Sequence, residues 1–227
     1  MFDADKGVPM PQAVLTLSSR NYSSWSLRGW LLCRMAGLDP VEEMVPIDAP
    51  GQRAELLLLS PSVLVPRLTH EGASVWDTLA IAEYLHERFP DAGLYPADTL
   101  MRAHCRSISG EIHSGFQNLR SALPMNLRSR HESFRLFAGA KPDIERIETI
   151  WQDCITRYGG PWLFGEAPTV ADAMFAPVAT RFVTYAVPLA PACAAYRDTV
   201  IAWPLMQQWT TAALEEPEEV EELDAEF

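Results

Sequence analysis

The sequence contains no long apolar run. No stretch of its 227 residues approaches the roughly 18 consecutive apolar residues that a membrane-spanning helix needs. Residues 1–12 are acidic and lack the basic start and apolar stretch of a secretory signal. We therefore expect a cytoplasmic protein that does not associate with membranes, and we interpret residues 1–12 as a loose N-terminal arm.

Basic residues are few. The chain has 18 Lys and Arg against 30 Asp and Glu, which gives a formal net charge of −12. Eight of the acidic residues lie within 215–226, and the rest of the chain carries only −4. We interpret residues 215–227 as a solvated acidic tail. This charge balance argues against a nucleic-acid partner, which requires a basic patch.

Cysteines are also scarce, and no two of them form a CxxC pair. That spacing excludes a zinc ribbon and argues against a dithiol redox site. Their neighbours are apolar, which is typical of buried, unreactive thiols. The histidines show no metal-ligand pairing, so we predict no metal site. The residues concerned are Cys33, Cys105, Cys154 and Cys193, and His70, His86, His104, His113 and His131.

The first part of the chain alternates between strand and helix patterns. Short apolar runs of strand length are separated by helical patterns and by Gly and Pro turns. We predict strands at 13–17, 43–47, 65–69 and 74–76, and helices at 26–36, after the turn at 49–51, and at 78–89. The predicted order, βαβα and then ββα, defines an α/β domain over residues 13–90.

Strand patterns end after residue 90. Apolar residues recur at helical spacing over 101–123 and again over 144–158, and a third helix begins at Thr169. Weaker helical patterns, broken by prolines 188, 191 and 204, continue to residue 214. We therefore predict an all-α domain over 98–214 packed against the α/β domain.

A serine-rich segment separates the first strand from the first helix. Residues 21–28 read Asn-Tyr-Ser-Ser-Trp-Ser-Leu-Arg. The start of a helix attracts anions, and a serine hydroxyl there can donate to a thiolate and lower the pKa of a bound thiol. We predict that role for Ser23. The alternative is that Ser23, Ser24 and Ser26 only cap the helix.

Two further motifs precede the helix at 78–89. Val65-Pro66 begins a predicted strand, and a cis bond there would turn the backbone of Val65 outward, towards an extended peptide. Thr78 follows Asp77 at the start of the helix, where it is a good N-cap. The helix start and the Thr78 hydroxyl can also bind a carboxylate, while Asp77 meets an adjacent ammonium group. That pair suits the zwitterionic end of an amino acid.

Taken in order, these motifs resemble the glutathione transferase superfamily over essentially the whole chain, in its serine-type bacterial form. The resemblance rests on Ser-Ser-x-Ser-x-Arg, Val-Pro, and Asp-Thr-x-Ala-Ile-x-x-Tyr-Leu, followed by Thr169-Val-Ala-Asp172, which matches the capping box of the helical domain. It implies the glutathione transferase fold, with a thioredoxin-like N-terminal domain and an all-α C-terminal domain. It also implies glutathione as co-substrate, a role in detoxification and a homodimer.

The resemblance assigns roles to individual residues. Ser23 matches the catalytic serine that donates to the glutathione thiolate. Val65 and the cis proline Pro66 match the residues that hold its cysteinyl part, and Asp77 and Thr78 match the pair that holds its γ-glutamyl end. Leu64 stands where many members have Lys or Gln, so one polar contact is absent.

The serine-rich segment is also similar, more distantly, to that of zeta-class enzymes, which isomerise maleylacetoacetate, although Trp25 stands where those enzymes have Cys. We predict conjugation of glutathione to a small electrophile. The alternatives are cis–trans isomerisation of a maleylacetoacetate-like diacid, and a non-catalytic binding protein of the same family. The electrophile pocket is predicted between the domains, with five candidate residues: Tyr22, Trp25, Phe116, Arg120 and Arg181.

Overall fold

The N-terminal part of the chain folds around a four-stranded sheet. The computed structural model describes residues 13–45, 64–132 and 138–217. The strands are β1 (Ala13–Leu17), β2 (Val41–Met44), β3 (Arg67–His70) and β4 (Ala73–Val75), in the spatial order β2-β1-β3-β4. β1 pairs parallel with β2 and antiparallel with β3, and β3 pairs antiparallel with β4.

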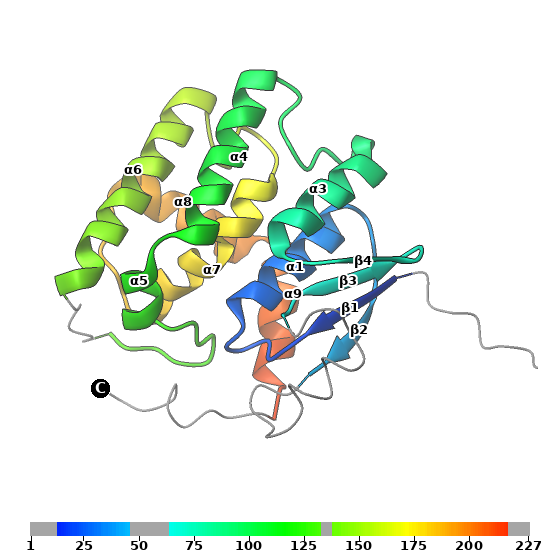
Figure 1. The fold of residues 1–227 in the computed structure, drawn as a ribbon. Helices are drawn as coiled ribbons and strands as arrows, with labels where there is room; N and C mark the ends of the chain where they lie inside the picture. Colours follow the sequence, from blue (N-terminus) through cyan, green and yellow to red (C-terminus); the bar gives the residue numbers. More distant parts are fainter. Residues whose placement is uncertain (1–12, 46–63, 133–137, 218–227) are drawn as a thin grey trace, which may run out of the picture.

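Two helices of this domain lie together on one side of the sheet (Figure 1). They are α1 (Ser24–Met35) and α3 (Thr78–Arg88). The predicted strand at 43–47 is displaced, because pairing with β1 already begins at Val41. β3 starts at Arg67, two residues after the predicted Val65, since Pro66 has no N–H to offer a sheet. The leucine-rich helix predicted after residue 51 lies outside the described residues.

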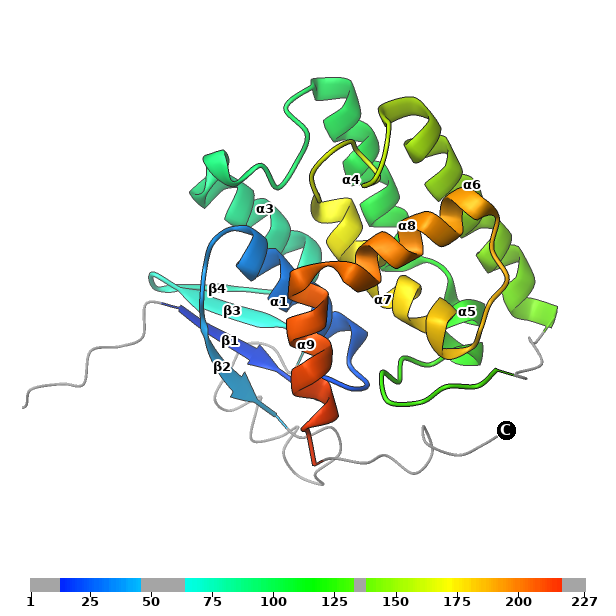
Figure 2. The same cartoon turned by 180° about the vertical axis from the view of Figure 1, so that it is seen from behind.

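The second part of the chain is helical. α7 runs through its centre, is buried along almost its whole length, and packs against α1, α4 and α8 (Figures 1 and 2). The helices are α4 (Thr99–Ser114), α5 (Gln117–Ala122), α6 (Lys141–Tyr158), α7 (Val170–Thr184), α8 (Pro191–Ala202) and α9 (Pro204–Leu214), with short 3₁₀ turns at Pro90–Ala92 and Ala138–Ala140. The predicted fold class, a thioredoxin-like domain followed by an all-α domain, is confirmed.

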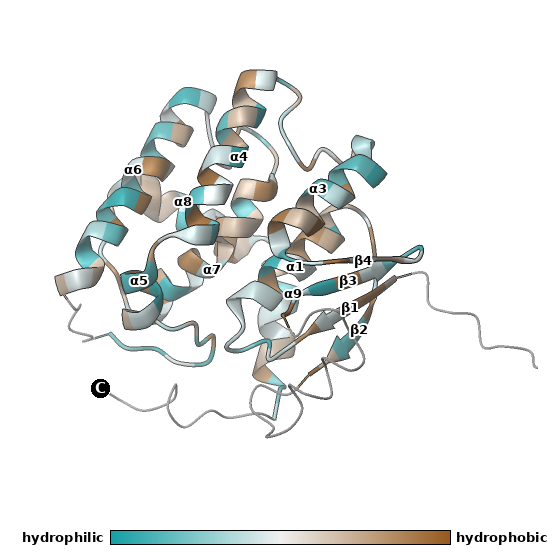
Figure 3. Ribbon diagram, viewed as in Figure 1, coloured by the Kyte–Doolittle hydropathy of each residue, from teal (hydrophilic) through white to brown (hydrophobic). Residues whose placement is uncertain are grey.

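The surface helices bury one face each. α6 carries alternating hydrophilic and hydrophobic bands along its length (Figure 3), and its buried residues include Ile147 and Trp151. α9 turns back to the first domain, where it packs against α1. There the indole of Trp209 lies against that of Trp30, with ring centroids 5.4 Å apart. Among the described residues no helix combines the length and the apolar character needed to cross a membrane.

The single long helix predicted over 101–123 is wrong, because the chain breaks between α4 and α5. Gly115 is extended there, with φ −103° and ψ −168°, and Phe116 adopts the left-handed conformation, with φ 61° and ψ 40°. The guanidinium of Arg120 donates to the carbonyls of Ile112 and Gly115, which the break leaves without helical partners. The apolar periodicity continues across the break and therefore conceals it.

The predicted capping segment at the start of α7 forms a buried network. The carboxylate of Asp172 accepts the Thr169 N–H at 2.7 Å and the Thr169 hydroxyl at 3.0 Å. It also accepts the Leu163 N–H at 3.1 Å and the Tyr196 hydroxyl at 3.0 Å. Burial raises the pKa of Asp172, and these hydrogen bonds oppose that rise. The motif thus joins α7, α8 and the preceding turn.

Candidate functional site

Ser23 is the N-cap of α1. Its hydroxyl oxygen accepts the backbone N–H of Ser26 at 3.2 Å, so of the three serines considered as caps it is Ser23 that caps α1. Its hydroxyl proton is directed to the Ser26 hydroxyl oxygen at 2.9 Å. The side chain is only partly buried. Capping uses the oxygen of Ser23, and the proton remains available for a stronger acceptor.

Ser26 is a residue that the sequence did not distinguish from its neighbours. It is fully buried, and its hydroxyl oxygen also accepts the Ser18 N–H at 2.9 Å. Ser26 therefore links the end of β1 to the Ser23 hydroxyl and fixes where that hydroxyl points. A serine in the first turn of a helix is expected to serve the helix itself, so nothing in the spacing indicated this role.

The Val65–Pro66 bond is cis. Pro66 is buried against α1, at a point where Gly29 leaves room for it: a Cβ on Gly29 would lie 2.5 Å from both Cβ and Cγ of Pro66. Pairing of β1 with β3 ends at Thr16 and Arg67, so Val65 lies beyond the last paired residue of β3. Its backbone thus lies just before the start of a central strand, beside the contact of Pro66 with α1. The neighbouring Leu64 is exposed.

The N-cap of α3 is Asp77, and the prediction that Thr78 caps this helix is wrong. One carboxylate oxygen of Asp77 accepts the N–H of Leu79 at 3.0 Å and of Ala80 at 3.5 Å. Asp77 is extended while Thr78 is already helical, so only Asp77 can reach back to those donors. Either residue is a common N-cap, and the sequence could not choose between them.

Thr78 is fully buried, and within the described part of the chain its hydroxyl has no hydrogen-bond partner. Leaving such a group unpaired costs about 1–3 kcal/mol. The hydroxyl lies in the first turn of α3, where the helix dipole favours an anion. A carboxylate placed there would accept from the hydroxyl and would also be favoured by the dipole.

Asp77 also connects the two domains. Its second carboxylate oxygen lies 2.9 Å from Nε2 of His113, on α4. The His113 ring in turn meets the indole of Trp25 edge-on, with centroids 5.1 Å apart. A line of contacts thus runs from Asp77 through His113 to Trp25, two residues after Ser23. The sequence missed His113 because its partner is distant in the chain.

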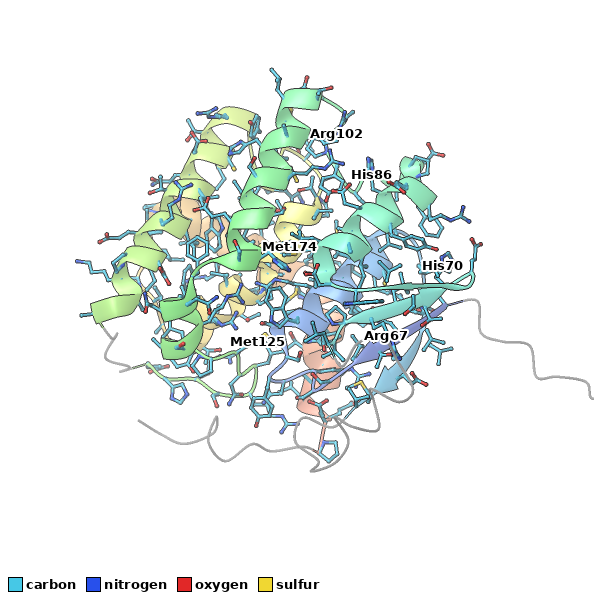
Figure 4. The ribbon with its side chains drawn as sticks, in the orientation of Figure 1. Arg67, His70, His86, Arg102, Met125 and Met174 are labelled. Carbon is cyan, nitrogen blue, oxygen red and sulfur yellow. The ribbon has the colours of Figure 1, made fainter. Side chains whose placement is uncertain are left out.

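Three arginines gather on the helical side of this line. The guanidinium of Arg28 lies 4.6 Å from the centre of the Trp25 ring, and that of Arg120 lies 4.9 Å from it. Arg28 and Arg181 are buried, and Arg120 is half-buried. Arg28 donates to the carbonyl of Met174, a residue labelled in Figure 4, at 2.8 Å. Arg181 donates to the carbonyl of Leu123 at 2.8 Å.

These arginines have no carboxylate counter-ion among the described residues: their partners there are backbone carbonyls and the Trp25 ring. One terminal nitrogen of Arg28 is buried without a partner in that part of the chain. Burial, and then the charges of Arg120 and Arg181, hold the pKa of Arg28 well below its usual value. Burial and the charge of Arg120 likewise lower the pKa of Arg181. An anion placed here would meet three concentrated positive charges.

The remaining predicted pocket residues, Tyr22 and Phe116, are mostly buried. Tyr22 lies in the loop before Ser23, and Phe116 lies at the break between α4 and α5, close in sequence to Arg120. Trp25 and Arg120 are thus in direct contact, and Arg181 joins Arg120 through charge. Within the described ranges, the contacts do not bring Tyr22 and Phe116 to Trp25 or to the arginines.

The four thiols are free and buried. Burial raises the pKa of Cys33, Cys105 and Cys154 to about 12 and that of Cys193 to about 11, which leaves these thiols protonated near neutral pH. The predicted burial of the four thiols is confirmed. Within the described residues no group of His, Cys, Asp and Glu could hold a metal ion.

Two family models match the chain. Residues 22–88 match the glutathione S-transferase N-terminal domain, and residues 111–212 match the glutathione S-transferase C-terminal domain. The first match contains Ser23, Val65, Asp77 and Thr78. The second contains His113, Arg120 and Arg181. The contacts described above therefore join residues from both matched regions.

Individual relatives agree with this assignment. Rat maleylacetoacetate isomerase is 30% identical over 178 residues, covering 76% of this chain and 79% of that protein. Maleylacetoacetate isomerase of Pseudomonas aeruginosa is 26% identical over 208 residues, covering 87% and 89%. A glutathione transferase homologue from Burkholderia with bound glutathione has the same fold, with a TM-score of 0.66 and 24% identity, over 90% of this chain and 98% of that one. The chain belongs to the glutathione transferase superfamily.

Proposed function

We propose that this protein is a glutathione transferase that conjugates glutathione to a small electrophile. The observation that carries the proposal is the buried hydroxyl of Thr78, next to Asp77, which has no hydrogen-bond partner among the described residues. The γ-glutamyl end of glutathione offers a carboxylate for the first group and an ammonium for the second. The backbone of Val65, which lies beyond the last paired residue of β3 and next to Pro66, would pair with the cysteinyl part.

Ser23 is the proposed thiolate donor. Its hydroxyl proton, now directed to Ser26, would turn to the glutathione sulfur, because a thiolate is a stronger acceptor than a neutral hydroxyl. The start of α1 adds favourable dipole charge. The thiolate then attacks an electrophilic carbon, a carbon–sulfur bond forms, and the leaving group departs with its electron pair.

The second candidate is a glutathione-dependent cis–trans isomerase of a maleylacetoacetate-like diacid. It is favoured by the arginines around Trp25, which offer positive charge to substrate carboxylates, and by the relatives that carry this name. Addition of the thiolate to the conjugated double bond would leave a single bond free to rotate. Expulsion of the thiolate would then restore the double bond in the trans form and regenerate glutathione.

The test uses the wild type, Ser23→Ala, and two assays. Glutathione binding is measured by calorimetry, and conjugation is followed with a generic aromatic halide. Retained binding with conjugation lowered at least about tenfold in Ser23→Ala is expected if Ser23 donates to the thiolate. No glutathione binding in the wild type would refute the enzymatic proposal. Binding without either reaction would identify a non-catalytic family member.

Isomerisation of maleylacetone is the matching assay for the second candidate. Arg181→Met removes one buried charge and keeps an apolar side chain of similar length. It should lower isomerisation more than conjugation to an uncharged halide. Equal losses in both assays would argue against a carboxylate-binding role. The proposed homodimer is tested by light scattering on the same preparations.

A further inference from the structure

The end of α9 contacts the loop that leads into α1. The carboxylate of Glu216 accepts the backbone N–H of Arg20 at 2.9 Å through one oxygen. Its other oxygen accepts the Ser19 hydroxyl at 2.5 Å and the Asn21 N–H at 3.1 Å. One carboxylate thus takes three donors from three consecutive residues. Hydrogen bonds to a charged acceptor are the stronger kind.

This loop determines where Ser23 lies. The Ser23 N–H donates to the carbonyl of Ser19 at 3.0 Å. The Ser19 hydroxyl oxygen, whose proton goes to Glu216, also accepts the Tyr22 N–H at 3.3 Å. Ser19 therefore connects the Glu216 carboxylate, through hydrogen bonds, to Tyr22 and to Ser23.

Glu216 is itself held in place from two sides. The guanidinium of Arg128 donates to the carbonyl of Ala213 at 3.1 Å and also to the carbonyl of Glu216. The indole N–H of Trp209, seven residues before Glu216, donates to the carbonyl of Arg20 at 3.0 Å. The loop 19–22 thus donates hydrogen bonds to Glu216 and accepts one from Trp209. These bonds, together with those from Arg128, hold the Glu216 carboxylate in place.

We propose that Glu216 is a positioning residue for the thiolate site: it holds the loop 19–22 so that the Ser23 hydroxyl meets the sulfur of glutathione. This inference rests on the proposed function. Glu216 acts through hydrogen bonds to the loop and not through its charge at a distance. A neighbouring acidic residue without those bonds is therefore the matched control.

Glu215 is that control. It is exposed, and it lines the same open cavity of about 460 Å³ as Glu216, together with Arg20, Met44 and Val45. Glu215→Gln and Glu216→Gln remove the same charge from the same place. Only Glu216→Gln also replaces an accepting carboxylate oxygen with an amide NH₂, which cannot accept a hydrogen bond from the loop. Ser19→Ala is a second variant, which removes the hydroxyl through which Glu216 acts and leaves the end of α9 intact.

The first measurement needs no glutathione. Amide hydrogen exchange over residues 19–23 should be at least about tenfold faster in Glu216→Gln than in wild type, because local opening becomes easier, and unchanged in Glu215→Gln. Circular dichroism and thermal unfolding verify that the variants are folded. Unchanged exchange in Glu216→Gln would overturn the inference whether or not the protein binds glutathione.

The second measurement links the loop to the thiol. Ultraviolet difference spectra of bound glutathione report the fraction of thiolate as pH is varied. In Glu216→Gln and in Ser19→Ala the midpoint should move to higher pH, and kcat for conjugation should fall by about 10- to 100-fold with KM for glutathione changed less. An unmoved midpoint would overturn the positioning role. A wild type that binds no glutathione would refute the proposed function alone.

Discussion

A carboxylate oxygen of Asp77, at the start of α3, lies 2.9 Å from Nε2 of His113, on α4, and this contact bridges the two domains. Both side chains are partly exposed, so the pair itself contributes little stability. The same carboxylate caps α3 through its other oxygen. Asp77 therefore caps α3 and is also proposed to bind the ammonium group of glutathione, and a substitution can separate these two roles.

Asp77→Asn separates them. The amide oxygen can still cap α3, so we expect the free energy of unfolding to change by less than about 1 kcal/mol. The charge that would meet an ammonium is lost, and glutathione affinity should fall at least about tenfold. Asp98→Asn is the control, because Asp98 caps α4 in the same way, through the N–H groups of Leu100 and Met101. Equal affinity in the two variants would contradict the assignment.

Thr78→Val removes the unpartnered hydroxyl and keeps the shape of the side chain. Without ligand the variant should be more stable than wild type by about 1 kcal/mol, since a buried unsatisfied group disappears. Its affinity for glutathione should fall about tenfold. Thr180→Val is the counterpart: that hydroxyl donates to the carbonyl of Pro177 at 2.8 Å, so its loss should destabilise the fold. Denaturant unfolding measures the change in the free energy of unfolding, which should be opposite in sign for the two variants, and calorimetry measures the change in glutathione affinity.

Gly29→Ala tests the close approach of α1 to Pro66. Alanine favours a helix by up to about 1 kcal/mol, but its Cβ would meet Pro66 at 2.5 Å, and overpacking costs about 1–3 kcal/mol. We expect a net loss of stability together with weaker glutathione binding. Gly110→Ala in α4 meets nothing within 4 Å and should gain stability. A Gly29→Ala variant more stable than wild type would contradict this expectation, because it would show that Pro66 can move away at little cost in free energy.

Asp172 predicts a pH dependence of stability. Burial raises its pKa, so the folded state holds this proton more tightly than the unfolded state. Its contribution is complete below the ordinary pKa of Asp and is lost as pH rises through the folded-state value. The stability of wild type relative to Asp172→Asn should therefore shrink as pH increases over that range. Unfolding curves at several pH values measure this difference, because all other groups titrate alike in both proteins.

The sequence predicted the parts of the site that short motifs carry. Ser23 at the start of α1 and the Asp77–Thr78 step are readable locally, because each depends on residues adjacent in the chain. The cis bond before Pro66 was implied by the family resemblance alone, since most X–Pro bonds are trans. The capping of α7 by Thr169 and Asp172 was readable for the same reason. The fold class followed from strand and helix patterns that agree along the whole chain.

Other parts depend on contacts between distant residues. The break at Phe116 is hidden because apolar spacing continues through it, and no sequence pattern pairs His113 with Asp77 or Glu216 with Arg20. The choice of Asp77 over Thr78 as N-cap depends on backbone angles that both residues can adopt. Burial of Arg28 against Met174 equally requires the helical domain to be in place.

The arginines around Trp25 also affect how fast a ligand arrives. The chain as a whole carries a formal charge of −12, while the arginine cluster holds positive charge that the described residues do not neutralise with a carboxylate. An anionic substrate is repelled at long range and attracted only within the reach of the cluster. Added salt screens the distant repulsion first, so stopped-flow association rates should rise with ionic strength even as equilibrium affinity declines.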